Sequence, residues 1–248
     1  MSPDVTTILV LAPIAFLGAF IYGVTGFGAG LVTIPLASHF YNIPFVLAVF
    51  ALLDGVNAMR ICLSQPRAIV RDEAARLIPT CVLGVGIGVG LLLVLPAKML
   101  MLALGCFVLG YGVYSILNPQ AMPVIRPYWA YVAGISGGIT SAMFGAGGPP
   151  YAIYLSMRPH GKDEIRSTLA VTSLVSVSVR IVAFALTGLL SSPLVWLTAL
   201  AVVPASLAAL WLADRVYRIL PRSTVIQAIR FLLCLSGVSL VWRAVTAA

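Results

Sequence analysis

Two glycine-rich stretches interrupt long apolar runs, and their residues have the types and spacing of an anion site. Residues 23–30 are Gly-Val-Thr-Gly-Phe-Gly-Ala-Gly, and residues 138–148 are Gly-Ile-Thr-Ser-Ala-Met-Phe-Gly-Ala-Gly-Gly. A short apolar run follows each stretch. A helix that begins at such a break directs unpaired N–H groups and its positive dipole end at the break. Two such helix starts that face each other would bind an anion.

Hydroxyl and glycine residues in these stretches are the first candidates for contact with the anion. Thr25, Thr140 and Ser141 can donate hydrogen bonds, and Tyr22 and Tyr151 can do so at the rim. The double proline at 149–150 fits the start of the second short helix, because proline needs no N–H there. The glycines whose backbone amides can approach the anion are Gly28, Gly30, Gly145, Gly147 and Gly148.

Ionisable residues inside apolar runs are functional candidates, because each costs about 2.5 to 3.5 kcal/mol to insert into a membrane. They are Asp54, Arg180 and Arg230. Ser176 shares a helical stripe with Arg180, and Asn57 shares a face with Asp54. We expect the arginines to offset the charge of the anion, and Asp54 with Asn57 to couple a proton or cation. A structural ion pair between Asp54 and an arginine is the alternative.

The remaining polar residues do not indicate catalysis or a metal site. His39 and His160 fall in separate loops and are expected to be solvated. No Ser-His-Asp, H-E-x-x-H or paired-carboxylate pattern is present, so we expect no enzyme activity, cofactor or metal. The acids beside basic loops stand at expected helix starts, where capping and the helix dipole explain them. These acids are Asp72, Glu73, Asp163 and Glu164.

The composition places these residues in a membrane. Of the 248 residues, 61% are hydrophobic and 9% are charged, whereas about 25% are charged in an average soluble domain. The mean hydropathy is +1.08, which predicts an integral membrane protein and excludes a soluble catalytic or nucleotide-binding domain. The net charge of +8 comes from loop lysines and arginines and reflects membrane topology rather than a nucleic acid partner.

The order of apolar runs and breaks repeats along the chain. Phe-Gly-Ala-Gly occurs at 27–30 and 144–147, Arg-Ile at 60–61 and 180–181, and Leu-Pro at 95–96 and 220–221. Matches in one order at nearly constant separation indicate an internal duplication. The first repeat is residues 1–122, with a hairpin at 5–38 and helices at 43–63, 74–95 and 97–117. The second is residues 123–248, with a hairpin at 128–157 and helices at 165–190, 193–213 and 225–246.

The positive charges predict the orientation. Three basic loops lie near residues 60–76, 158–166 and 215–222. All three fit the cytoplasm only if each glycine-broken segment enters and leaves the membrane on one side. Each repeat then has one re-entrant hairpin and three crossings, which inverts the second repeat relative to the first and puts both termini outside. An eight-span parallel repeat with a weak charge bias is the alternative.

Close packing is the common use of glycine in membrane helices. We apply it to Gly84, Gly86, Gly88 and Gly90, which form two overlapping GxxxG patterns. For the two glycine-rich stretches, packing alone stays open as an alternative. Non-helical backbone at membrane depth is tolerated only where it is buried in protein or lines a polar cavity, which favours a functional centre there.

The doubled segments 23–35 and 134–151, each a glycine-rich loop followed by proline, resemble the paired signature of the TauE/SafE family, also called the 4-toluene sulfonate uptake permease family. The resemblance covers the whole chain and implies a carrier for sulfite, sulfoacetate or other organosulfonates in the bacterial cytoplasmic membrane. The chain departs from the pattern at Ala29, Ala146 and the double proline, which affects pocket width. The binding region implied by the resemblance is Thr25, Gly26, Phe27, Gly28, Gly30, Pro35, Thr140, Gly145, Gly147, Gly148 and Pro149.

The sequence therefore predicts an all-α polytopic membrane protein with two inverted repeats. We expect a secondary transporter that binds a small sulfur-containing anion between the hairpin tips and moves it by alternating access. An anion channel, or a structural or accessory membrane subunit without sulfur specificity, is the alternative. The expected partners are the anion, the lipid bilayer and a coupling proton or cation, without nucleic acid.

Overall fold

The chain is α-helical throughout the part that the computed structural model describes, which is residues 5–64, 68–117 and 124–219 with a few single positions between 234 and 245. The predicted helix 225–246 lies largely outside the described residues, and Arg230 and the predicted repeat boundary at 122–123 are also outside them. The first half contains α1 (Val5–Thr25), α2 (Ala29–Ala37), α3 (Ile43–Ser64), α4 (Arg71–Val94) and α5 (Ala97–Leu117). The second contains α6 (Trp129–Phe144), α7 (Gly148–Ser156), α8 (Lys162–Leu186) and α9 (Pro193–Ile219).

The helices differ from the predicted runs mainly at their polar ends. α4 begins at Arg71 and α8 at Lys162, ahead of their apolar runs, because acids in the first turn favour a helix N-terminus. α9 continues past position 213 to Ile219. α8 ends at Leu186 rather than 190, and the turn that follows it contains Gly188 with a left-handed φ of 81°. Apolar runs thus locate the part of a helix inside the membrane and miss its polar ends.

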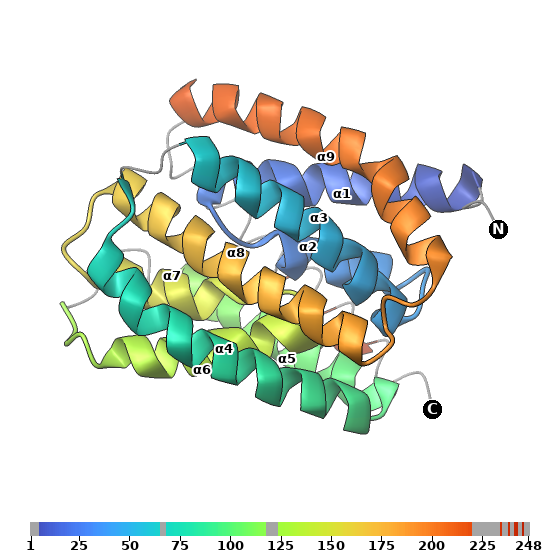
Figure 1. Cartoon of the computed structure of the whole chain (residues 1–248), viewed down its shortest axis with the longest axis horizontal. Helices are drawn as coiled ribbons and strands as arrows, with labels where there is room; N and C mark the ends of the chain where they lie inside the picture. Colours follow the sequence, from blue (N-terminus) through green and yellow to red (C-terminus); the bar gives the residue numbers. More distant parts are fainter. Residues whose placement is uncertain are drawn as a thin grey trace.

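The two largest interfaces join one half of the chain to the other. α1 packs along α9 on one side of the molecule, and α4 packs along α6 on the opposite side (Figure 1). α3 and α8 lie between them, with α8 also against α4 and α3 against α9. α1, the long helix before the first break, therefore packs on α9, the second long helix after the second break. In the same way α6, before the second break, packs on α4, the second long helix after the first break. The two halves are interlocked in one bundle.

Glycines on one face of α4 let α6 approach closely. A Cβ on Gly88 would lie 2.7 Å from the carbonyl oxygen of Ile139, and one on Gly84 would meet another carbonyl of α6. At Gly86 and Gly90, no described atom of a neighbouring element lies within 4 Å of such a Cβ. The predicted packing role is confirmed for Gly84 and Gly88, whereas Gly86 and Gly90 are exposed and pack on no described element. Positions two apart lie on nearly opposite sides of a helix, so only one of the overlapping patterns faces α6.

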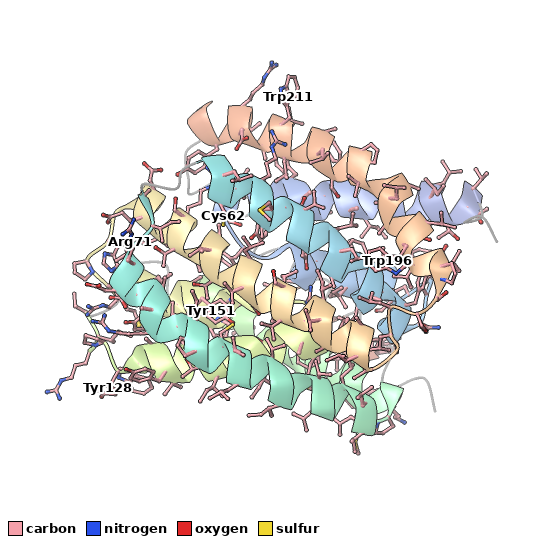
Figure 2. All side chains as sticks on the ribbon, viewed as in Figure 1. Cys62, Arg71, Tyr128, Tyr151, Trp196 and Trp211 are labelled. Atoms are coloured by element: carbon pink, nitrogen blue, oxygen red, sulfur yellow. The ribbon has the colours of Figure 1, made fainter. Side chains whose placement is uncertain are left out.

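The outer surface of the bundle is apolar, as contact with lipid requires. Among the described residues, α1, α3, α4, α8 and α9 are long and apolar enough to cross a membrane. Leu83 is 64% exposed and Leu200 is 70% exposed. Trp211 projects from α9 at the edge of the molecule (Figure 2). Such extensive exposed apolar surface on long apolar helices indicates a multi-pass membrane protein.

Candidate functional site

The first break separates α1 from α2. Gly26 and Gly28 have left-handed φ angles of 81° and 92°, which residues with a Cβ rarely adopt. Thr25 closes the turn, because its hydroxyl donates to the Phe27 carbonyl at 2.6 Å and accepts from the Phe27 N–H at 3.3 Å. α2 then begins at Ala29. The first N–H groups of α2, which no carbonyl of that helix can accept, are therefore at the break.

The second break separates α6 from α7. Gly145 ends α6 with a left-handed φ of 61°, and its N–H donates to the Ser141 carbonyl at 2.9 Å. The start of α7 contains Pro149 and Pro150, which confirms the predicted position of the double proline. Proline fits a helix start but has no N–H. α7 therefore directs fewer amide donors at its break than α2 does.

The two breaks contact each other, although they lie far apart in the sequence. Gly30 packs so closely on Gly145 that a Cβ on Gly30 would fall on the Gly145 carbonyl group. A Cβ on Gly148 would lie 2.5 Å from the Cβ of Phe27. The Phe-Gly-Ala-Gly sequences of the two halves thus cross, and the crossing requires residues without a side chain.

A small cavity lies where the breaks meet. Tyr151 of α7 lines it and lies in the middle of the molecule (Figure 2). Ser173 and Val177 were missed by the sequence analysis; they occur seven and three positions before Arg180, so the stripe on α8 could have revealed them. The cavity is lined by the predicted residues Tyr22, Phe27, Gly28, Gly30, Asp54, Ser141, Gly145, Gly147, Gly148, Tyr151 and Ser176, with Ala29, Ser173 and Val177.

Other predicted residues lie outside this lining. The hydroxyl of Thr140 donates to the Ser136 carbonyl at 2.9 Å, and that of Thr25 bonds to backbone within its own turn. Asn57 is buried in α3, and its Oδ1 has no hydrogen-bond partner among the described residues. The predicted residues that do not line the cavity are Thr25, Gly26, Pro35, Asn57, Thr140, Pro149 and Arg180.

Three hydroxyl groups in the cavity wall have no hydrogen bond of ordinary geometry to the described residues. They belong to Tyr22, Tyr151 and Ser176. The tyrosines were expected at the rim, but Tyr22 is 5% and Tyr151 0% exposed, because both project into the interior of the bundle. Buried hydroxyl groups are nearly always hydrogen-bonded, so a polar ligand or water in the cavity would complete them.

Arg180 of α8 lies buried behind the cavity. Its Nη2 is 3.0 Å from Asp54 Oδ2, and its Nη1 donates to the Ser141 carbonyl oxygen at 2.6 Å. Its side chain is 1% exposed, and its Nε has no hydrogen-bond partner in the described part of the chain. This is the ion pair that the sequence analysis gave as the alternative role of Asp54. It also places a positive charge directly behind the cavity wall.

Arg166, an arginine that the sequence analysis did not single out, contacts the first break in a similar way. Its Nη2 donates to the Gly23 carbonyl oxygen at 2.5 Å and lies 3.2 Å from Asp214 Oδ1. Arg166 and Arg180 thus each bond a carbonyl near the C-terminal end of a broken helix, where positive charge is favourable. Their spacing of about four helical turns places them on one face of α8 and could have revealed Arg166.

Glu73, in the first turn of α4, has a larger role than the capping predicted for it. Its side chain is 2% exposed and accepts from the Tyr154 hydroxyl at 2.5 Å and from Arg158 Nε at 2.9 Å. His160 Nε2 lies 3.4 Å from Glu73 Oε1, so the expectation that His160 is solvated is wrong. Arg76 Nη1 lies 3.4 Å from Oε2. This Glu73 cluster joins α4 to the end of α7, which only the tertiary fold brings together.

The family model described as Sulfite exporter TauE/SafE matches residues 11–240. The chain belongs to this family. The resemblance inferred from the two glycine-rich stretches is therefore confirmed, and the family is one of transporters. The protein named "Probable sulfite/organosulfonate exporter TauE" in Cupriavidus necator is 29% identical over 170 residues, which cover 66% of this chain and 66% of that protein, just under two thirds of its length. No solved structure matches the chain.

Proposed function

We propose that this chain is a secondary transporter that binds a sulfur-containing anion in the cavity between the two breaks and moves it across the bacterial cytoplasmic membrane by alternating access. The observation that carries the proposal is the meeting of two helix breaks at one cavity, which is lined with buried hydroxyl groups that lack a hydrogen bond of ordinary geometry to the described residues. The family and the name of the Cupriavidus necator relative support the substrate class, which is sulfite or an organosulfonate such as sulfoacetate.

The groups around the cavity suit an oxyanion. The start of α2 supplies backbone amides and the positive end of a helix dipole. Tyr22, Tyr151 and Ser176 supply hydroxyl donors from α1, α7 and α8. Arg180 lies behind them, in an ion pair with Asp54. Sulfite and sulfonate groups each present three oxygens around one sulfur, so they use donors that converge from several helices.

We further propose that the two halves are inverted repeats, with α1–α2 and α6–α7 as re-entrant hairpins. The equivalent pairing of α1 with α9 and of α6 with α4 supports this arrangement. The basic loops would then face the cytoplasm and the termini the outside. Because the breaks meet at the contact between the repeats, movement of one repeat against the other would open the cavity to one side at a time.

A structural or accessory role is the second candidate, and the Asp54–Arg180 pair is the observation that favours it. A buried ion pair and tightly crossed glycines are also what a helix scaffold requires. An anion channel would use the same groups without saturation. Saturable, selective sulfoacetate counterflow in proteoliposomes would support the carrier over both.

Ser176→Ala tests the site directly. Ser176 lines the cavity, and its hydroxyl has no hydrogen bond of ordinary geometry to the described residues. A hydrogen bond to a charged ligand contributes about 1.5–3 kcal/mol, or roughly 10- to 150-fold in affinity. We expect Ser176→Ala to lose affinity for the bound anion by that factor. A thermal-shift titration with sulfite, sulfate, sulfoacetate, isethionate and acetate measures the affinity, because a ligand stabilises the folded state it binds. Ser178→Ala is the matched control on the same helix, since its exposed hydroxyl donates to the Leu174 carbonyl at 2.8 Å and does not line the cavity. Stabilisation by acetate as strong as by any sulfur anion would contradict the proposed substrate class.

A further inference from the structure

Asp54 stands between the charge of Arg180 and the cavity. Asp54 lines the cavity, whereas Arg180 does not. Two contacts of Arg180, to Asp54 Oδ2 at 3.0 Å and to the Ser141 carbonyl oxygen at 2.6 Å, use two of its five guanidinium N–H groups. The Nε of Arg180 is buried without a partner among the described residues. The arginine is therefore close enough to attract an anion but is neutralised by the carboxylate in front of it.

The protonation state of Asp54 decides what an anion meets. When ionised, the Asp54 carboxylate only accepts hydrogen bonds and repels an anion in the same cavity. When protonated, Asp54 offers an O–H donor to the cavity and leaves the positive charge of Arg180 uncompensated. The other polar groups of the lining are hydroxyls and backbone amides, and their charge is the same in both states.

The other ionisable side chains near Asp54 come from the helices that pack on α3. Arg180 of α8 faces Asp54 directly, and Tyr22 of α1 is the ionisable side chain that approaches it from that helix. α2, which also packs on α3, has no ionisable residue. On α9, Asp214 is engaged with Arg60 at 3.6 Å and Arg166 at 3.2 Å. Within the described residues, Asp54 is therefore the group whose neutralisation changes the charge at the cavity.

We propose that Asp54 is a proton-binding site linked to anion binding, so that one proton from solvent protonates the Asp54 carboxylate as one sulfur-containing anion enters the cavity. The inference rests on the proposed function, because it assumes that the cavity binds such an anion. The anion and the proton then move through the cycle together. Asp54 acts by freeing the charge of Arg180 and by donating its own O–H.

The test is sulfoacetate binding to the detergent-purified protein by titration calorimetry. Both acid groups of sulfoacetate are ionised from about pH 6 to about pH 8, so any pH dependence belongs to the protein. As the pH rises through the range in which Asp54 is ionised in the free protein, we expect the affinity of the wild type for sulfoacetate to fall by up to about tenfold per pH unit. We also expect uptake of one proton per anion, measured from the difference in heat between two buffers of unequal ionisation enthalpy.

Asp54→Asn should bind sulfoacetate independently of pH and without proton uptake, because the amide keeps a donor and cannot ionise. Asp214→Asn is the matched control: Asp214 also pairs with an arginine of α8 but does not line the cavity, so its variant should keep the pH dependence. Asp54→Glu is the second variant if Asp54→Asn does not fold. It should keep proton uptake with a shifted pH midpoint.

The outcomes separate the two proposals. Sulfoacetate binding by the wild type without pH dependence or proton uptake would overturn the role of Asp54 and leave the proposed function standing. Retention of the wild-type pH profile in Asp54→Asn, or an unchanged midpoint in Asp54→Glu, would also overturn it. Absence of binding by sulfoacetate and sulfite at every pH, with the protein folded, would overturn the proposed function and the proton site together.

Discussion

Replacing Gly30 by alanine tests whether contact between the two breaks forms the site. Gly30 lies in the first turn of α2, where alanine is the better helix former by about 0.8–1 kcal/mol. Its Cβ, however, would fall on the Gly145 carbonyl group and lie 3.1 Å from the Gly145 Cα. These Gly145 atoms belong to the backbone, so the overlap cannot be relieved by a change of side-chain rotamer. α2 would have to move away from the second break by about an ångström.

We expect this strain to outweigh the gain in helix propensity. Overpacking of a buried contact costs about 1–3 kcal/mol, and Gly30→Ala should lose that much stability. If α2 moves away from the second break and the site widens, the cost of about 1–3 kcal/mol should instead lower the anion affinity by roughly 5- to 150-fold. Thermal unfolding in detergent, without and with a series of sulfoacetate concentrations, measures both quantities.

Gly86→Ala is the matched control, because no described atom of a neighbouring element lies within 4 Å of its new Cβ. It should be neutral or stabilise the protein by about 0.4–1 kcal/mol. Equal unfolding temperatures and equal sulfoacetate affinities for the two variants would refute the argument that the crossing of the breaks shapes the cavity.

Two further predictions concern the Glu73 cluster and the topology. Glu73→Gln should lower the free energy of unfolding by about 1–3 kcal/mol, because it removes the charged acceptor that Arg158 and Tyr154 share. Asp72→Asn on the exposed neighbour should change it little, and equal effects of both in thermal unfolding would argue against the cluster. Cysteines placed at the exposed Ser191 and Gly161, with the native cysteines replaced, should react with an impermeant reagent from opposite sides of the membrane, Gly161 from the cytoplasm. Reaction of both from one side would contradict the inverted topology.

The amino-acid sequence by itself determined the membrane class, the helix-forming runs, both breaks and the family. Each depends on local composition: apolar length decides which segments suit lipid, and Gly26, Gly28 and Gly145 mark the turns that need left-handed backbone. Most of the cavity lining was also predicted, because Phe-Gly-Ala-Gly occurs twice and both copies reach the site. The inverted topology stays a prediction.

The tertiary structure alone decided which polar side chains meet. The sequence left Asp54 open between coupling and an ion pair, and only the packing of α3 on α8 brought it to Arg180. The same holds for Arg166 at Gly23 and for Glu73 beside Arg158. These contacts depend on how each helix is rotated and which helix it packs against. Local sequence patterns do not encode that, because every face of a membrane helix is largely apolar.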